Sequence, residues 1–253
     1  MIRWLRDAHD PLPPARRALA ADSEAPGLVA AGGELTRARL AEAYAKGIFP
    51  WFSEGQPVLW WSPDPRMVLL PAEFRLSRTL RRTLRRMVDG DGELRIDHDC
   101  RAVIEACAST PRHGESGTWI VDTMIDAYAD WHEAGGVHSF ETWIDGELAG
   151  GLYGVCIGRM FFGESMFARR TDASKIALAG LTAFCLEHGI ETIDCQQRTA
   201  HLASLGGREL ERAQFLRRLG DGISMPAIND WTYDLRMWRR LGIGPGTVED
   251  PRP

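Results

Sequence analysis

A run of three successive strand signals, the first with alternating apolar and polar residues, constrains the fold of this chain most strongly. It begins at residues 137–144, and the Asp145-Gly146 pair that follows is a strong hairpin signal. Residues 147–156 continue as a second strand, and after a short turn a third follows at 160–167. The segment therefore predicts a three-stranded antiparallel meander.

Helical patterns on both sides of the meander indicate the α+β class. Residues 174–188 are apolar on nearly all faces and stop at Gly189, as expected of a buried helix, and a strand over 190–196 should follow. Ahead of the meander, Asp99 and Asp122 are expected to cap two further helices. This order of elements is similar to that of the GNAT acyltransferases, and by that analogy we expect a GNAT-like α+β domain.

The N-terminal part of the chain is rich in Pro, Gly and Trp. A turn is expected at residues 27–35, and a short helix should run from Thr36 to Gly47. The prolines at 57, 63 and 65 favour connecting loops rather than a sheet.

With 253 residues the chain is long enough for a small module joined to a larger domain. We expect an N-terminal α/β module over residues 1–65 and the GNAT-like domain over 66–235. Residues 236–253 should be a loose tail, because Gly, Pro and acidic residues accumulate near the end of the chain.

Composition argues against several classes of protein. Hydrophobic residues make up 44% and charged residues 26%, as in an ordinary globular protein. No stretch approaches the roughly 18 uninterrupted apolar residues of a membrane helix, and the charged first residues are unlike a signal peptide. The five cysteines form no Cys-x-x-Cys pair, and no His, Cys and Asp residues have zinc-ligand spacing. We therefore expect a cytoplasmic protein with reduced thiols, no metal and no cofactor.

Residues 77–88 predict an amphipathic helix with a basic face. Its leucines recur at helical spacing, and its other face carries arginines with no acid among them. A solvated face capped by Ser77 is one interpretation. We favour contact with an anionic partner, because solubility alone favours mixed signs. The net charge of −5 argues against indiscriminate binding to nucleic acid but allows such a local patch.

Asp194 and Gln196 are the candidate catalytic residues, because they directly follow a short apolar run. In a strand they share one face, and Ile193 and Cys195 lie on the other. An acid and an amide that point together can bind one reacting amine or carbonyl, as acyl transfer requires. A polar strand end in solvent is the alternative. Cys195 faces away from the pair, so we do not expect it to act as a nucleophile.

Several strings rich in Trp and Phe occur in a characteristic order with the stretch that contains Asp194. They read GIFPWF at 47–52, LWWSPDPR at 59–66, TWI at 118–120, HSFETW at 138–143, FFGESMF at 161–167 and IDCQQRTAHLASLG at 193–206. Together they resemble the leucyl/phenylalanyl-tRNA–protein transferases, bacterial enzymes that add Leu or Phe to proteins beginning with Lys or Arg. The similarity extends from about residue 27 to about residue 217.

The resemblance implies a site for the aminoacyl end of a charged tRNA. The positions that match the family's amino-acid pocket are Leu152, Met166, Leu181 and Ile193. By residue type alone they could be ordinary core. Met166 suits a pocket for two different side chains, because methionine is unbranched and adaptable. Leu152 replaces a methionine associated with the family, which leaves the preference between Leu and Phe open.

The resemblance also implies contacts with the rest of the tRNA. Trp51, Trp119 and Tyr128 match aromatic residues around the terminal adenosine, where base stacking contributes about 1–3 kcal/mol. The positions that match a basic patch for the acceptor stem are Arg78, Arg82, Arg85 and Arg86.

For the acceptor protein, Glu164 is the carboxylate expected near the incoming Lys or Arg. Strand periodicity should place it on the same face as Phe162 and Met166. A plain surface glutamate is the alternative, disfavoured because apolar neighbours would then surround an unpaired charge.

The implied reaction is attack of the acceptor's α-amine on the aminoacyl ester, which marks the product for degradation through the N-degron pathway. Asp194, through Gln196, would act either as a general base or as an orienting anion. An acetyl-CoA-dependent N-acetyltransferase is one alternative, disfavoured because residues 168–175 have no glycine turn for a pyrophosphate. A non-catalytic tRNA-binding protein is the other.

Overall fold

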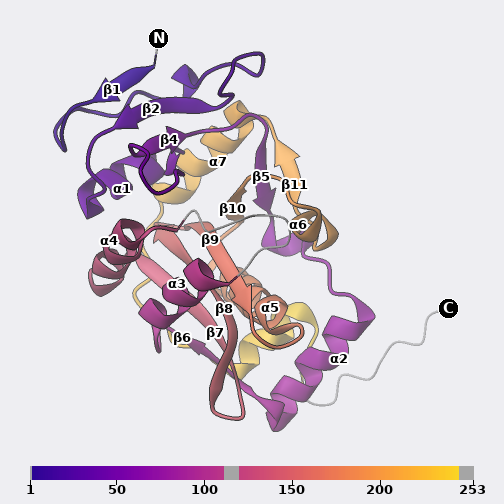
Figure 1. The fold of residues 1–253 in the computed structure, drawn as a ribbon. Coiled ribbons are helices and arrows are strands. Elements are labelled where there is room, and N and C mark those ends of the chain that lie inside the picture. The colour runs from indigo at the N-terminus through magenta and orange to yellow at the C-terminus, as the bar shows by residue number, and fades with distance from the viewer. Residues whose placement is uncertain (1, 111–119, 245–253) are drawn as a thin grey trace.

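Figure 1 shows a small sheet at one end of the molecule and a larger sheet with helices on both faces. The computed structural model describes residues 2–110 and 120–244. The strands are β1 Arg3–Leu5, β2 Leu28–Gly32, β3 Phe49–Pro50, β4 Leu59–Trp61, β5 Arg66–Leu69, β6 Glu93–Ile96, β7 Val137–Ile144, β8 Glu147–Ile157, β9 Met160–Ala168, β10 Thr192–Gln196 and β11 Arg208–Leu210. The α-helices are α1 Arg37–Ala45, α2 Arg78–Arg86, α3 Cys100–Ser109, α4 Asp122–Glu133, α5 Ala173–His188, α6 Ala200–Ser204 and α7 Arg212–Ile223. Shorter helical segments are η1 Ala15–Arg17, η2 Pro71–Glu73, η3 Met87–Asp91 and η4 Leu235–Leu241.

The small sheet has the strand order β1-β2-β4-β3. The expectation of loops rather than a sheet was therefore wrong, as was the turn expected at 27–35. Leu28–Gly32 is instead a strand with every residue buried between β1 and β4. The prolines at 57, 63 and 65 lie in connections between strands, so they do not exclude a sheet. Pro50 lies in the edge strand β3, where an N–H is dispensable.

The short helix expected after Thr36 is confirmed as α1. The Thr36 hydroxyl accepts a hydrogen bond from the Arg39 N–H, as an N-cap does. Leu40 and Tyr44 are fully buried on its apolar side.

The larger sheet has the order β11-β5-β10-β9-β8-β7-β6, which confirms the meander of β7, β8 and β9 and the α+β class. Only β9 and β10 pair in parallel within this sheet, and the buried helix α5 connects them. Asp99 caps α3, as predicted. Asp122 does not cap α4, because Val121 holds the N-cap position and Asp122 is the first helical residue.

Two hydrophobic cores lie on the two faces of this sheet. The α4-side core contains Tyr44, Trp60, Val103, Tyr128 and Phe162 among its members, so the N-terminal part and the larger sheet share it. The α5-side core lies under α5 and α2 and includes Leu80, Leu84, Leu152, Phe184 and Trp238.

The expectation of a loose tail from residue 236 was wrong for its first part. Leu235–Leu241 forms η4, and Met237, Trp238 and Ile243 are buried in the α5-side core. Composition did not reveal this helix, because its apolar residues are interspersed with arginines. Residues 245–253 lie outside the described part. No helix within the described ranges is both long and apolar enough to cross a membrane.

Candidate active site

The sheet opens between β9 and β10. The two strands pair only from Met160 to Phe162 and from Thr192 to Asp194. Each then carries a β-bulge, with Glu164 as the extra residue opposite β8 and Cys195 as the extra residue opposite β5. Bulges re-aim side chains and occur next to active sites.

The bulge on β9 corrects one prediction. Glu164 does not share a face with Met166, because the extra residue changes the phase of the strand. Glu164 turns toward Tyr128 on α4, whereas Met166 pairs with Leu152 and packs on the α5-side core. Periodicity cannot reveal this, because it assumes an unbroken count of two.

Asp194 is fully buried and bound by Arg66. The Arg66 Nε donates to Asp194 Oδ1 at 2.7 Å, and Nη2 donates to Oδ2 at 2.6 Å. This is a bidentate, charge-assisted pair, the strongest arrangement available to a carboxylate. The Gln196 N–H also donates to Asp194 Oδ1, at 3.0 Å. Both oxygens of the carboxyl group are therefore held by hydrogen bonds.

Arg66 is itself held by the N-terminal part and by α7. Its guanidinium lies 4.8 Å from the Phe49 ring centroid and 4.6 Å from that of Phe215. Its Nη1 donates to the Gly47 carbonyl at 3.2 Å. Sequence reasoning missed Arg66. Its signal was a charge at the start of the otherwise apolar run Arg66–Leu69, which requires a buried partner.

Gln196 connects Asp194 to Glu164. Its backbone has φ of 54°, a left-handed conformation that follows the bulge. With this backbone its carboxamide Nε2 donates to Glu164 Oε1 at 3.2 Å, while its N–H caps Asp194. Asp194 and Gln196 thus lie on the same side of the sheet, and Cys195 turns to the α5-side core. Burial raises the pKa of the Cys195 thiol, which makes it a poor nucleophile.

Two tyrosines complete the network. The Tyr128 hydroxyl donates to Glu164 Oε2 at 3.0 Å, and the Tyr44 and Tyr128 hydroxyls are 2.5 Å apart. Burial raises the pKa of the Glu164 carboxyl to about 7, although the hydrogen bonds from Tyr44 and Tyr128 oppose the rise. Glu164 therefore changes charge near neutral pH, unlike an ordinary glutamate.

The four residues matched to the amino-acid pocket come together in the α5-side core. Leu152, Leu181 and Ile193 are buried, and Met166 packs beside them with partial exposure. They lie on the face of the sheet opposite Glu164, which turns toward Tyr128 of the α4-side core.

The three aromatic residues matched to the adenosine differ in exposure. Trp51 is 39% exposed and packs edge-to-face on Trp61, with centroids 5.7 Å apart. Tyr128 is fully buried, and its ring packs on Tyr153. Trp119 lies outside the described residues.

The basic face forms as the sequence predicted. Ser77 caps α2 by accepting from the Leu80 N–H, and Leu80 and Leu84 are buried. Arg78, Arg82 and Arg86 are exposed, and Arg85 is partly exposed.

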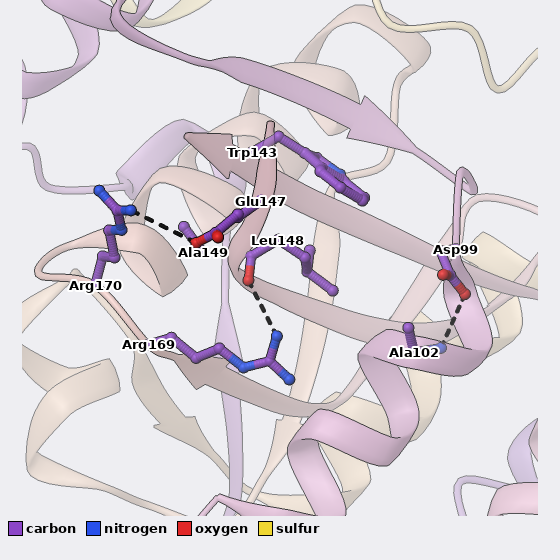
Figure 2. Close-up of a pocket in the computed structure, with 8 residues that line it drawn as sticks. All are labelled: Asp99, Ala102, Trp143, Glu147, Leu148, Ala149, Arg169 and Arg170. Atoms are coloured by element: carbon purple, nitrogen blue, oxygen red, sulfur yellow. Dashed lines mark hydrogen bonds and ion pairs between the residues drawn. The ribbon is translucent and has the colours of Figure 1, made fainter. Parts of the chain in front are cut away.

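A separate pocket of about 480 Å³ lies between the start of α3 and the β7–β8 hairpin (Figure 2). Its lining contains none of the predicted site residues. The Arg169 Nη1 donates to the Leu148 carbonyl at 3.3 Å, and Arg170 pairs with Glu147 at 3.6 Å (Figure 2). Both arginines are thus tied to the hairpin.

Two acids, an amide and two phenols therefore converge where β9 and β10 separate. Comparisons with known proteins identify the family.

The family model described as leucyl/phenylalanyl-tRNA protein transferase matches residues 68–220, and the model of its N-terminal domain matches residues 33–64. The transferase of this name from Methylibium petroleiphilum is 61% identical over 247 residues, which cover 97% of this chain and 93% of the relative. That from Leptothrix cholodnii is 62% identical over 250 residues, covering 97% and 98%. A crystal structure of a conserved protein of unknown function from Bacteroides thetaiotaomicron aligns with a TM-score of 0.37 and 14% identity, over 65% of this chain and 57% of that chain. The chain belongs to the leucyl/phenylalanyl-tRNA protein transferase family.

Proposed function

We propose that this enzyme transfers Leu or Phe from charged tRNA to the N-terminal Lys or Arg of acceptor proteins in the cytoplasm, which marks them for degradation. The network of Asp194, Gln196 and Glu164 at the opening of the sheet carries the proposal, because it offers an amine both a fixed acceptor and a titratable acid. Family membership supports the tRNA donor.

We further propose that residues 66–235 form a GNAT-like domain. Its support is the meander followed by α5 and by a parallel strand that leaves its neighbour after three pairs. In the donor site, Leu152, Met166, Leu181 and Ile193 would receive the amino-acid side chain. Trp51 and Trp119 would lie around the adenosine, with Trp51 the ring that is exposed to stack. Tyr128, which the resemblance also matched to the adenosine, is fully buried and would support Glu164 instead.

In the proposed reaction the deprotonated α-amine attacks the ester carbonyl carbon. A C–N bond forms, the ester C–O bond breaks, and the amine proton passes to the ribose oxygen of the released tRNA. The Gln196 carboxamide nitrogen is engaged with Glu164, so its oxygen is available to accept from the amine. Asp194 acts as an orienting anion rather than as the base, because Arg66 and the Gln196 N–H occupy its oxygens. Much of the rate then comes from positioning, since the ester is already activated.

Glu164 would recognise the positive charge of the acceptor. When ionised it presents a carboxylate beside Gln196, within a partly apolar site where a charge pair is strong. Arg78, Arg82, Arg85 and Arg86 would hold the acceptor-stem phosphates.

Turnover with Leu-charged tRNA and a peptide that begins with Lys tests the proposal, with the extended peptide measured by mass. The same peptide beginning with Met is the control for acceptor recognition. Product from acetyl-CoA in place of the tRNA would identify an N-acetyltransferase. Binding of tRNA with no product from any donor would leave only a tRNA-binding role.

A further inference from the structure

The C-terminal helix η4 is bonded to the basic helix α2. The Arg81 Nη1 donates to the carbonyl oxygens of Leu241, at 3.3 Å, and Gly242, at 3.4 Å. These are the carbonyls at the C-terminal end of η4, where Gly242 ends the helix with φ of 67°. A cationic side chain there satisfies carbonyls that the helix itself leaves unpaired. Arg81 therefore joins the two elements.

A shared core holds η4 in place. Met237 and Trp238 are buried in the α5-side core, which also contains Leu80 and Leu84 of α2. Both elements lie at the end of the molecule away from the small sheet (Figure 1). Buried anchors of this kind make η4 a rigid continuation of the α2 surface.

Three exposed arginines of these two elements form no ion pair within the described ranges, whereas Arg236 and Arg240 of η4 pair with Asp234 and Glu187. Arg239 of η4 is exposed and forms no ion pair with any residue of the described ranges, and the same holds for Arg78 and Arg82 of α2. Other exposed arginines are neutralised, as Arg101 is by Glu105 and Asp126. Arg78, Arg82 and Arg239 thus present positive charge without an ion pair, on a chain whose net charge is −5.

We propose that α2 and η4 form one phosphate-binding surface, the α2–η4 surface (Arg78, Arg82 and Arg239), and that Arg239 contacts the backbone of the donor tRNA. This rests on the proposed function, since it names a further contact for the same donor. Arginines along one helix reach phosphates along one line. A second basic element beside that helix broadens the contact, which fixes orientation without reading sequence.

Binding of charged tRNA measured at several salt concentrations tests this surface. Arg239→Ala should weaken binding about three- to tenfold and make the slope of log affinity against log salt shallower by roughly 0.7–0.9, the value for one lost phosphate contact. Arg239→Lys should keep most of the slope, because a lysine still supplies the charge. Arg217→Ala is the matched control, since Arg217 on α7 is also exposed with no ion pair among the described residues.

A minimal donor, an aminoacyl-adenosine without an acceptor stem, separates this inference from the proposed function. Arg239→Ala should use the minimal donor as well as the wild type does and be impaired only with full tRNA. If the wild type binds tRNA and Arg239→Ala behaves like Arg217→Ala, the surface stops at α2 and the inference is wrong. If the wild type transfers nothing from either donor, the proposed function has failed instead.

Arg81→Ala supplies a second test of the same surface. It should weaken tRNA binding by releasing η4, and its effect should not add to that of Arg239→Ala, because the two changes act on one element. Full additivity in the double variant would mean that Arg81 does not position Arg239.

Discussion

Both β9 and β10 carry an acidic residue at a bulge, yet they hold these acids in opposite ways. On β10, Asp194 is fully buried and bound by the Arg66 guanidinium through two hydrogen bonds. On β9, Glu164 forms no ion pair with any described residue, and its partners are an amide and a phenol.

In the proposed function, this difference gives Asp194 and Glu164 different roles. Arg66 and the Gln196 N–H hold both oxygens of Asp194, which fits a positioning role in the proposed function. Burial raises the pKa of Glu164 to about 7, so its charge depends on pH in the physiological range. The surroundings of each acid, rather than its residue type, therefore decide that Asp194 would position Gln196 and that Glu164 would change charge with pH.

The largest effect is expected when the ion pair between Arg66 and Asp194 is removed. Arg66→Met should destabilise the protein by about 3–5 kcal/mol, because Asp194 is left as an unpaired buried charge. Transfer should be lost as well, since Gln196 loses its fixed support. Denaturant unfolding and turnover at a temperature where the variant is folded measure the two effects.

A double variant, Arg66→Met with Asp194→Leu, is the control for stability. It removes both charges and should recover much of the lost stability, as apolar replacement of buried pairs does elsewhere. Transfer should stay absent, because the Gln196 N–H has no acceptor. Normal turnover in the double variant would show that the pair serves only the fold.

The next largest effect is expected at Glu164, and it tests the role of this residue in acceptor recognition. Glu164→Gln should raise the KM for peptides beginning with Lys about 10- to 100-fold, the loss expected when a charged hydrogen-bond partner becomes neutral. In the wild type this KM should fall as pH rises through about 7, because the Glu164 carboxyl loses its proton in that range. The variant should lose that dependence. An unchanged ratio of kcat/KM between Lys- and Met-initiated peptides would remove Glu164 from acceptor recognition.

A smaller effect is expected at the phenol. Tyr128→Phe removes a hydrogen bond to Glu164 that lowers its pKa, so the midpoint of the KM profile should move above 7. At high pH, where Glu164 is ionised in both proteins, the KM values should converge. The variant with both Tyr44→Phe and Tyr128→Phe removes both phenol hydrogen bonds to Glu164, so its midpoint should move further up than that of Tyr128→Phe alone. A profile that keeps its midpoint would contradict the coupling.

Local signals predicted much of the fold. The Asp145-Gly146 turn, the apolar helix α5 and the leucine spacing of α2 all act within a few residues, and all three elements form where expected. The small sheet was missed because its central strand β2 is a short run of mostly small residues that reads as a turn. Pairing with strands from distant parts of the chain decided its conformation.

The site was predicted in part for the same reason. Asp194 and Gln196 are two residues apart, so periodicity could place them together. Arg66 is 128 positions from Asp194 in sequence, and no local pattern joins them. The bulge at Glu164 is set by the pairing of β8 with β9, which a residue count cannot see. The Arg66–Asp194 pair and the bulge at Glu164 therefore depend on long-range strand pairing, which local sequence patterns do not show.

The smallest expected effect concerns the choice between Leu and Phe on the donor. Leu152 faces Met166 across the β8–β9 pair in the α5-side core, so a change at either position alters the shape available to the donor side chain. Leu152→Met conserves volume and should cost less than about 1.5 kcal/mol in stability. Methionine adapts its shape more readily, so the ratio of kcat/KM for Phe-tRNA to that for Leu-tRNA should rise by a few-fold, which is less than the roughly 10- to 200-fold that one added or missing methylene commands in a pocket. Competition between the two charged tRNAs at a fixed Lys-initiated peptide measures the ratio directly.

Leu148→Met, at a buried position of β8 assigned to the α4-side core, is the matched control and should leave this ratio unchanged. Equal ratios in all three proteins would mean that the donor side chain binds elsewhere.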